Sequence, residues 1–429
     1  MANIILTNTC NIQCPFCFAS ENNEQKAVVF DPMKTWKISS FIGSKPFRFC
    51  GGEPSLTPNI TEMTQALLNS GYNIMMMTNG VWPESFRNFM LKLPVKFQVR
   101  FSYLFNILHP SFYKNNELQK ICDNISLVNP LMCTLGFTIY KEDFDYEYLF
   151  ELAEKFGIKK IRWSVAAPNI SNEVDRLESQ FEKIAGLVYK MHKEGAARGL
   201  TVHGDCNYIQ PCHYDKNELN DLLINHSLKF GCSNSSPVDI APDGLAWRCY
   251  GLYSVLQKNI SEFEGEKDME RYFTRRVQLL KNLYAYEECK ECEYLKKGCD
   301  GGCFVYRIKK AYKQNPDLVL FPIDDDKSIL DCRPFRNRHL ALNTDKQSNK
   351  LYFREKLILD EDENTISFLQ EIDGQKTIQE LINMWKDNFS TYDAAVNTIV
   401  GKCRELFEKD YIQLNYDYKI KPESRPVLQ

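Results

Sequence analysis

Short runs with β-type residues alternate with longer helical patterns along the first half of the chain. The six runs lie at residues 3–8, 47–52, 73–79, 97–102, 133–140 and 161–167. A stretch with helical periodicity follows each run, for example at 59–69 and 177–198. This alternation is typical of repeated βα units around a parallel sheet. We therefore predict an α/β first domain over residues 1–204 with six such units.

A different pattern follows the polar stretch NTDKQSNK near residue 345. Asp373-Gly374 predicts a turn, and Thr377 with Glu380 forms a capping box that opens the next helix. Apolar residues then mark one face of a last helix at steps of four, four and three: Ala395, Ile399, Cys403 and Leu406. Residues 345–429 are predicted to form a short β-hairpin followed by three helices, a small winged-helix shape.

Composition is that of a globular protein of several domains. The 429 residues suffice for about three domains of ~150 residues each. A net charge of -3 supplies no field for nucleic acid or an anionic membrane. No stretch approaches the ~20 apolar residues of a transmembrane helix. A strand that begins by Ile4 leaves no room for a signal peptide, so we expect a cytoplasmic protein whose sixteen cysteines favour metal binding over disulfides.

Three cysteines follow the first strand with the spacing C-x3-C-x2-C: Cys10, Cys14 and Cys17. Three thiolates on one short loop can hold three irons of a [4Fe-4S] cluster, and no fourth cysteine follows nearby. The fourth iron would then be open to a substrate or cosubstrate. The alternative is a zinc knuckle, which needs four ligands in a closed tetrahedron.

The run LTNTCNIQCPFC resembles the signature of the radical SAM enzymes. The resemblance implies that the open iron binds the amino and carboxylate groups of S-adenosylmethionine, and that Phe16 packs on its adenine. It covers the whole first domain and implies a partial (β/α)6 TIM-like barrel.

Gly51-Gly52-Glu53-Pro54 follows the second strand and matches the GGEP element of the same family. In that family the backbone and the glutamate receive the methionine ammonium group. Two glycines permit close backbone approach, and a carboxylate suits a cation. Alone, Gly-Gly would be an ordinary turn. Its position suits a site, because loops converge at the carboxyl ends of parallel strands.

Further contacts to the cosubstrate are implied at other strand ends. Thr78-Asn79-Gly80 closes the third predicted strand and Ser102 the fourth, where the family places polar contacts to ribose and carboxylate. Helix caps or turns are the alternative for such residues. Val165-Ala166-Ala167 closes the sixth strand and could present apolar surface to the adenine or belong to the core. His109 is expected to be structural.

A second cysteine pattern occupies residues 205–340. In order, it contains Cys232, Gly244 and Cys249 as G-x4-C, the run Cys289-x2-Cys292-x6-Cys299-x3-Cys303, and Cys332. It resembles the SPASM domain, a seven-cysteine extension that binds two auxiliary [4Fe-4S] clusters. One extra residue between Cys292 and Cys299 departs from the usual spacing, which a loop tolerates cheaply.

The SPASM resemblance implies a distribution of ligands. Cys232, Cys249 and Cys303 would hold the first auxiliary cluster. The second would be held by Cys289, Cys292, Cys299 and Cys332. The first then lacks a ligand, which Cys206 or Cys212, substrate or solvent could supply; an ordinary reduced thiol is the alternative for both cysteines.

Two other roles are considered for the cysteines: zinc binding in residues 205–340, and packing in the core for the cysteines outside the two patterns. A zinc domain would need eight ligands, and the nearby histidines all precede Cys232: His203, His213 and His226. The other cysteines fall inside predicted strands or helices and are expected to be small core residues: Cys50, Cys122, Cys133 and Cys403.

The C-terminal segment IDGQKTIQELI and the terminal helix resemble the RiPP recognition element, a peptide-binding module. In that family a leader peptide adds as an extra strand to the hairpin edge. A DNA-binding winged helix is the competing interpretation, but from Asp345 onward twelve Lys and Arg face sixteen Asp and Glu, the wrong sign for phosphate binding. The third interpretation is that this domain is a structural cap.

Together these features predict a radical SAM/SPASM enzyme that cleaves S-adenosylmethionine reductively. Its 5'-deoxyadenosyl radical would oxidatively modify, and in our interpretation cross-link, a ribosomally made precursor peptide recognised by its leader. The implied cofactors are S-adenosylmethionine and three [4Fe-4S] clusters, and the implied partner besides the peptide is an electron donor such as flavodoxin or ferredoxin. The alternatives are a sulfatase-maturase-like protein dehydrogenase, a small-molecule radical SAM oxidase, or a cluster-based redox regulator that binds DNA.

Overall fold

The chain forms two compact units. The computed structural model describes residues 2–17, 19, 37–38, 40–43, 46–166, 177–205, 209–226, 228, 230, 237–284, 286–290, 292–294, 299–344, 349–354, 356–358 and 362–415. The first unit contains residues 1–270 and 292–305, and the second contains 271–291 and 306–429. The division into domains 1–204, 205–340 and 345–429 stays a prediction.

A ten-stranded sheet forms the frame of the first unit, in the order β10-β9-β8-β1-β2-β3-β4-β5-β6-β7. Strands β8 and β1 to β7 are parallel to one another, whereas β9 runs antiparallel to both β8 and β10. The strands are β1 (Ala2–Thr7), β2 (Phe47–Gly51), β3 (Ile74–Thr78), β4 (Phe101–Asn106), β5 (Cys133–Ile139), β6 (Lys160–Val165), β7 (Thr201–Gly204), β8 (Val238–Ile240), β9 (Leu245–Trp247) and β10 (Gln257–Asn259).

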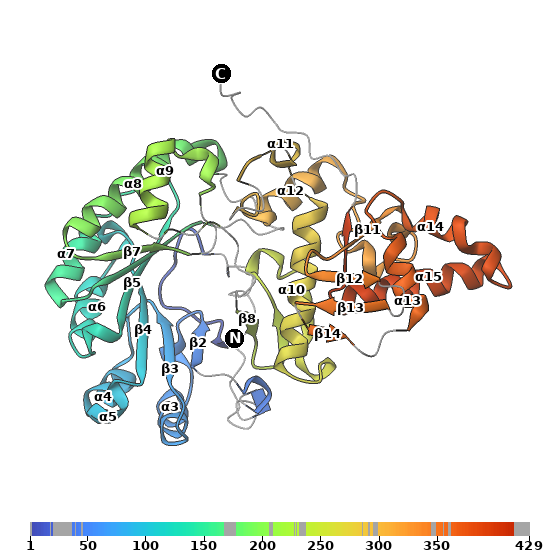
Figure 1. Ribbon diagram of the computed structural model, residues 1–429. Helices are drawn as coiled ribbons and strands as arrows, with labels where there is room; N and C mark the ends of the chain where they lie inside the picture. The colour runs from blue at the N-terminus through green and yellow to red at the C-terminus, as the bar shows by residue number, and fades with distance from the viewer. Residues whose placement is uncertain are drawn as a thin grey trace. The chain divides into compact units, whose positions relative to one another are not determined.

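Helices cover one face of this sheet (Figure 1). They are α3 (Ile60–Asn69), α4 (Glu84–Lys92), α5 (Val95–Gln98), α6 (Glu117–Ile125), α7 (Glu147–Phe156), α8 (Phe181–Ala197) and α9 (Lys216–Asn225). Phe49 of β2 and Trp163 of β6 are fully buried, while the residues on either side of them in the strands are half-buried and more polar. The apolar face packs against the helices, and the more polar face is available for chemistry.

Five of the six predicted strands are present with ends within two residues of the expected ones, but the fourth is displaced. The strand predicted at 97–102 lies at Phe101–Asn106. Pro94 precedes a helical turn over Val95–Gln98, and Val95 and Val99 are exposed. The buried alternation begins at Phe101 and continues through Tyr103 and Phe105.

Strands β7 and β8 extend the parallel sheet beyond the six predicted units. β8 pairs with β1, and Asn3 Nδ2 donates to Asp239 Oδ1 at 2.8 Å between them. A three-residue strand has no periodicity to detect, so its place beside a strand more than 230 residues earlier has no local signal. Three further helices follow along the chain: α10 (Glu266–Leu283), α11 (Glu287–Lys290) and α12 (Phe304–Gln314). α11 and most residues of α10 and α12 belong to the second unit.

Beyond α12, the second unit combines two small sheets with three further helices. Strands β12 (Leu340–Thr344), β13 (Asn349–Phe353) and β14 (Lys356–Ile358) form an antiparallel sheet, and β11 (Arg333–Arg336) pairs with β15 (Ile412–Asn415). The helices are α13 (Glu363–Glu371), α14 (Ile378–Trp385) and α15 (Tyr392–Glu408). The predicted hairpin and three helices are therefore present, with a third strand added; the winged-helix assignment stays a prediction.

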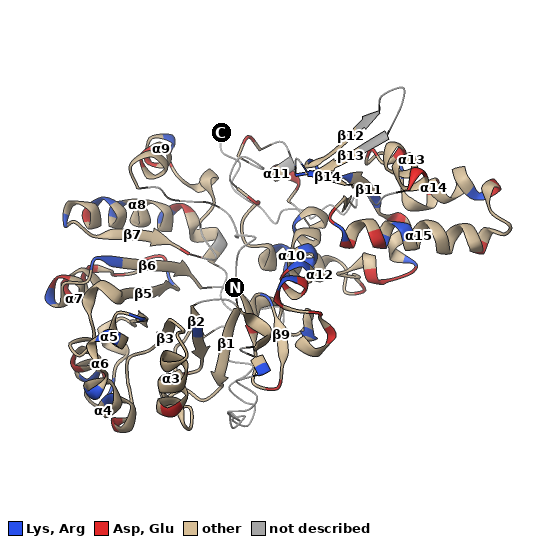
Figure 2. Ribbon diagram, turned by 60° about the horizontal axis from the view of Figure 1, so that its bottom comes forward, with Lys and Arg blue, Asp and Glu red and all other residues tan. Residues whose placement is uncertain are grey.

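Local signals in this segment are reproduced. Thr377 and Glu380 form the complete capping box, and Gly374 takes a φ of 83° in the turn. The predicted face of α15 is buried at each of its four positions. Acidic and basic residues occur together on α15 (Figure 2), where Lys402 and Lys409 both pair with Glu405. Among the described helices, none has the length and apolarity to cross a membrane.

Candidate functional site

The loop that carries the first three cysteines packs directly against the GGEP loop. Gly52 N donates to Thr7 O at 2.7 Å, and Glu53 N donates to Thr9 O at 2.8 Å. A Cβ on Gly52 would lie 2.2 Å from Thr9 O, and one on Gly51 would lie 2.3 Å from Thr7 O. Both glycines are required here because only hydrogen leaves room for the neighbouring backbone.

Glu53 holds the ends of β2 and β3 together. Its carboxylate is fully buried and accepts from Ser55 N at 3.1 Å, Thr78 Oγ1 at 2.9 Å and Asn79 N at 2.7 Å. Burial raises the pKa of this carboxyl, and the hydrogen bonds oppose that effect. The predicted residues Glu53, Thr78 and Asn79 thus form one network, in which the carboxylate is bound by the protein itself.

Asn79 extends the network to the cysteine loop. Its Nδ2 donates to Asn11 Oδ1 at 2.8 Å and lies 3.5 Å from Cys10 Sγ. Asn11 Nδ2 in turn donates to Val81 O at 2.7 Å. The end of β3 therefore orients the loop after β1. Asn11 was missed by the sequence reasoning, and its position inside the C-x3-C spacing was the available signal.

The three loop thiols are half-buried and influence one another. Burial, together with the neighbouring Cys17 and Cys10, raises the pKa of Cys14 to about 12. Burial also raises the pKa of Cys10. Within the described residues, no three Cys, His, Asp or Glu side chains converge on a common point as metal ligands. The donor set nevertheless suits a cluster, because the three adjacent soft thiols lie partly exposed on one loop.

An aromatic cavity lies beside Phe16. The ring of Phe16 stacks on Tyr140 with centroids 5.1 Å apart, and Phe112 meets Tyr140 edge-on at 5.8 Å. The cavity is also lined by His109, whose Nε2 lies 3.5 Å from Asp145 Oδ2. Stacked aromatic rings suit a flat aromatic ligand. Tyr140 ends the fifth predicted strand, so an aromatic residue at a strand end was its signal.

Two residues that were predicted to contact the cosubstrate differ from expectation: Ser102 lies at the other end of its strand, and Val165 lies in the core. Ser102 is at the amino end of β4, and its hydroxyl donates to Ile74 O at 3.2 Å. Asn106, exposed, occupies the carboxyl end that Ser102 was predicted to hold. Val165 ends β6 but is buried on the same face as Trp163. Ala167 lies outside the described residues.

Of the predicted auxiliary ligands, four described ones belong to the first unit: Cys249, Cys292, Cys299 and Cys303. Cys249 has a φ of 72°, uncommon for a residue with a side chain. Cys299 is buried, and its sulfur accepts from Gly301 N at 3.3 Å. Cys212 is exposed. Cys206 and Cys232 lie outside the described residues.

The remaining two predicted ligands, Cys289 and Cys332, belong to the second unit. Cys332 is fully buried, and its thiol lies 3.7 Å from Ser328 O. Burial raises the pKa of Cys403 to about 12, with Cys332 adding to the effect. Cys122, Cys133 and Cys403 are buried, as predicted for core residues. Cys50 is half-buried, on the polar face of the sheet.

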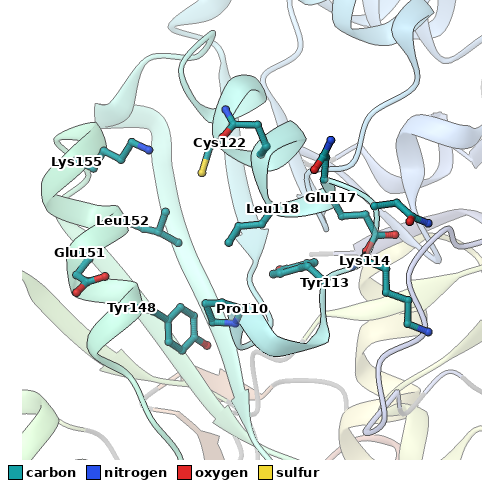
Figure 3. Close-up of a pocket in the computed structure, with 13 residues that line it drawn as sticks. Pro110, Tyr113, Lys114, Glu117, Leu118, Cys122, Tyr148, Glu151, Leu152 and Lys155 are labelled. Carbon is teal, nitrogen blue, oxygen red and sulfur yellow. Dashed lines mark hydrogen bonds between the residues drawn. The ribbon is translucent and has the colours of Figure 1, made fainter.

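A separate pocket opens between α6 and α7 (Figure 3). Leu118 and Leu152 point into it from the two helices, and Lys155 and Cys122 lie at one end. Burial raises the pKa of Cys122 more than Lys155 lowers it, so this thiol is not an activated nucleophile. The pocket belongs to the helix layer of the first unit rather than to the cysteine loop.

No family model matches the chain. It is 31% identical over 99 residues to 7,8-dihydro-6-hydroxymethylpterin dimethyltransferase of Methanocaldococcus jannaschii, a match that covers 22% of this chain and only 19% of that protein. A probable GTP 3',8-cyclase of Thermococcus kodakarensis is 22% identical over 263 residues, which are 57% of this chain and 83% of that protein.

The fold resembles that of SuiB of Streptococcus suis, solved with bound S-adenosylmethionine. The TM-score is 0.54 at 15% identity, over 72% of this chain and 73% of SuiB. SuiB bound to its precursor peptide SuiA gives 0.52 at 15% identity, over 72% of each chain. The prediction of a mixed α/β fold with a large parallel sheet is therefore confirmed.

Proposed function

We propose that this chain is a radical SAM enzyme that modifies a ribosomally made peptide. The observation that carries the proposal is the packing of the C-x3-C-x2-C loop against Gly51-Gly52 and the Glu53 network at the carboxyl ends of β1 to β3. The similarities to SuiB, to the cyclase and to the methyltransferase support the same class.

Cys10, Cys14 and Cys17 would hold a [4Fe-4S] cluster, and Gly51, Gly52, Glu53 and Pro54 would border the methionine end of S-adenosylmethionine. When bound, the cluster and cosubstrate supply a 5'-deoxyadenosyl radical that removes hydrogen from an unreactive C–H bond. The stacked rings of Phe16 and Tyr140 would pack against the adenine, with Val165 near the same strand ends. Asn79 and Asn11 orient the cysteine loop through their hydrogen bonds.

A peptide substrate is supported by two features. SuiB, which shares this fold, has been solved with its precursor peptide. In the second unit, β12 and β14 are the outer strands of a three-stranded sheet, and each has one side unpaired by the described strands. An unpaired strand can accept an extended peptide as an additional strand. We propose that the leader of the precursor binds at one of these two edges, with auxiliary clusters held by the SPASM cysteines.

Glu53→Gln is expected to weaken S-adenosylmethionine binding while iron content is unchanged. In this variant the side-chain NH2 would face other donors, such as the Thr78 hydroxyl or the Asn79 N–H. The charge-assisted hydrogen bond to the methionine ammonium group would also be lost. Such a loss costs ~1.5 to 3 kcal/mol, which is roughly ten to a hundredfold in affinity for S-adenosylmethionine. Isothermal titration with the anaerobic, iron-loaded protein measures the affinity. Glu62→Gln, at an exposed position on α3, is the matched control. If the Glu53 variant binds S-adenosylmethionine with unchanged affinity, the Glu53 network is not part of the cosubstrate site.

Leader binding is testable on the intact chain by photo-cross-linking. A photoreactive amino acid replaces Lys356 in β14 or Ala341 in β12, both exposed, and Asn397 on the exposed side of α15 serves as the control. The probe is a synthetic leader from a short open reading frame beside the gene. We expect an adduct from one edge strand and none from Asn397. Equal labelling at all three positions, or none, would count against leader binding at this sheet.

Deletion of residues 345–429 is a poorer test, because this segment is part of the second unit's core. β15 pairs with β11 along four residues, and Arg275 donates to Phe407 O. Removing the segment would expose those partners and destabilise the remainder of the second unit.

The alternatives of a protein dehydrogenase or a small-molecule oxidase would use the same cysteine loop. A peptide that forms no adduct and no product would favour them.

A further inference from the structure

The hydroxyl of Thr78, at the carboxyl end of β3, lies at the centre of four close contacts in the first unit. Its Oγ1 lies 2.9 Å from Glu53 Oε1 and 3.0 Å from Glu53 Oε2. The same oxygen accepts from Gly80 N at 3.0 Å and from the indole Nε1 of Trp82 at 2.9 Å. Thr78 is 1% exposed and Trp82 is 6% exposed, so these contacts are shielded from water.

The two N–H donors decide which way the Thr78 hydroxyl points. A threonine hydroxyl has one proton to donate and two lone pairs that accept. Gly80 N and Trp82 Nε1 occupy both lone pairs, so the proton is left for the Glu53 carboxylate. The hydroxyl thereby becomes a fixed donor that bridges the two oxygens of Glu53. Hydrogen bonds to an ionised acceptor are the stronger ones, and hydrogen bonds in a chain polarise one another.

Trp82 is held in place by packing against neighbouring elements. Its ring meets Phe86 of α4 edge-on, with the centroids 5.3 Å apart, and its centroid lies 5.8 Å from that of Phe105 of β4. The turn before Trp82 is fixed as well. Gly80 has a φ of 80°, and its carbonyl accepts from Asn124 Nδ2 of α6 at 2.9 Å. The direction of the indole N–H is therefore set by helices and strands of the first unit.

We propose that Trp82 is a positioning residue for S-adenosylmethionine: through Thr78, its indole N–H holds the Glu53 carboxylate in the orientation that receives the methionine ammonium group. The inference rests on the proposed function, in which Glu53 borders that end of the cosubstrate. Two hydrogen bonds in series connect the buried indole with the carboxylate. Without the N–H, one lone pair of Thr78 is open and the hydroxyl can rotate away. Glu53 then keeps Ser55 N and Asn79 N as donors but loses the fixed donor that bridges its two oxygens.

The test measures S-adenosylmethionine binding and reductive cleavage with the anaerobic, iron-loaded chain. One variant is Trp82→Phe, and in a second variant Trp82 is replaced by benzothienylalanine, an isostere in which sulfur takes the place of the indole N–H. We expect the Kd and the KM for S-adenosylmethionine to rise roughly two- to tenfold, as for the loss of one hydrogen bond, with kcat and iron content unchanged. If the smaller phenylalanine ring costs the protein its iron, the isostere carries the same test.

Trp163→Phe is the matched control. Trp163 is a fully buried tryptophan of the same unit, and its Nε1 donates to His192 Nε2 at 3.0 Å. The variant therefore loses a comparable buried hydrogen bond that has no connection to Glu53. Its Kd and KM for S-adenosylmethionine should equal those of wild type. An equal loss of affinity in both phenylalanine variants would contradict the proposal, because any buried indole would then have the same effect.

A double-mutant cycle separates positioning through Thr78 from packing of the indole ring. In a Thr78→Val background, which already lacks the hydroxyl, Trp82→Phe should cause no further loss of affinity. In a Thr78→Ser background, which keeps a hydroxyl, the loss should return. Additive losses in the valine background, or an unchanged affinity of the benzothienylalanine variant, would overturn the proposal.

The same measurements distinguish this inference from the proposed function. Iron-loaded wild-type protein that neither binds nor cleaves S-adenosylmethionine would refute the proposed function itself, and this inference with it. Wild-type binding and cleavage that both Trp82 variants retain in full would refute only the role of Trp82.

Discussion

Replacing Cys10, Cys14 and Cys17 together with alanine is expected to remove about four iron and four sulfide per chain from an anaerobic total of about twelve each. The same change should abolish formation of 5'-deoxyadenosine, because the loop is the predicted ligand set of the cluster that binds S-adenosylmethionine. Iron and sulfide analysis and chromatography of the reaction products measure both effects. The loss should be nearly complete, since no other described cysteine lies on this loop.

Cys133→Ala provides the matched control. Cys133 is a buried cysteine of β5 in the same unit, and its removal should leave iron content and S-adenosylmethionine cleavage intact. A triple variant that retains the full iron content, or wild-type protein that binds zinc in place of iron, would contradict the radical SAM assignment.

Wild-type protein is expected to lose stability between pH 5 and pH 8 through one buried carboxyl group. Asp239, on β8, is 6% exposed and accepts a hydrogen bond from Asn3. Burial raises the pKa of Asp239 to about 7. The unfolded chain has a pKa near 3.9, so the folded state binds the extra proton across this interval. Stability is therefore greatest below pH ~4 for this group and is lost as pH rises through the folded value.

Asp239→Asn should remove this dependence. The amide oxygen still accepts from Asn3 but carries no charge, so the variant should exceed wild type in free energy of unfolding by roughly 2 to 3 kcal/mol more at pH 8 than at pH 5. Urea unfolding of metal-free protein at pH 5, 6, 7 and 8 measures the difference. Nearby Cys50 and Tyr250 respond to the same charge and stay un-ionised in this range.

Asp221→Asn is the control of opposite sign. Hydrogen bonds from Asn225 and Lys193 lower the pKa of Asp221 to about 2, so it is ionised in both states throughout this pH interval. Its effect on stability should not vary between pH 5 and pH 8. If the difference between wild type and Asp239→Asn is likewise constant with pH, Asp239 is not the group that titrates.

Most of the first unit's sheet could be predicted because its strands are buried runs bounded by turn residues. The fourth strand shows where such reasoning fails. Val95, Phe97 and Val99 alternate with polar residues like a strand, yet Pro94 starts a helical turn there and both valines face solvent. Period-two alternation does not show which face is covered, and that depends on helices packed from elsewhere.

The candidate site was partly readable for the same reason. Consecutive parallel strands place their following loops side by side, so the cysteine loop, GGEP and Thr78-Asn79 were expected together and lie together. The partners of Glu53 were not predicted. Its carboxylate accepts hydrogen bonds from Ser55, Thr78 and Asn79. Whether a carboxylate binds donors of the protein or a ligand depends on its burial and on the distances to those donors, which local sequence does not show.

The amino-acid sequence by itself determined the βα order, the cysteine spacings, the capping box at Thr377 and the apolar face of α15, because these signals involve residues a few positions apart. Only the tertiary structure decided that β8 joins β1 and that Asp239 is buried beside Asn3. The reason is physical. Sheet neighbours and the solvation of charged groups are set by segments far away in sequence, whose approach leaves no mark on the local pattern.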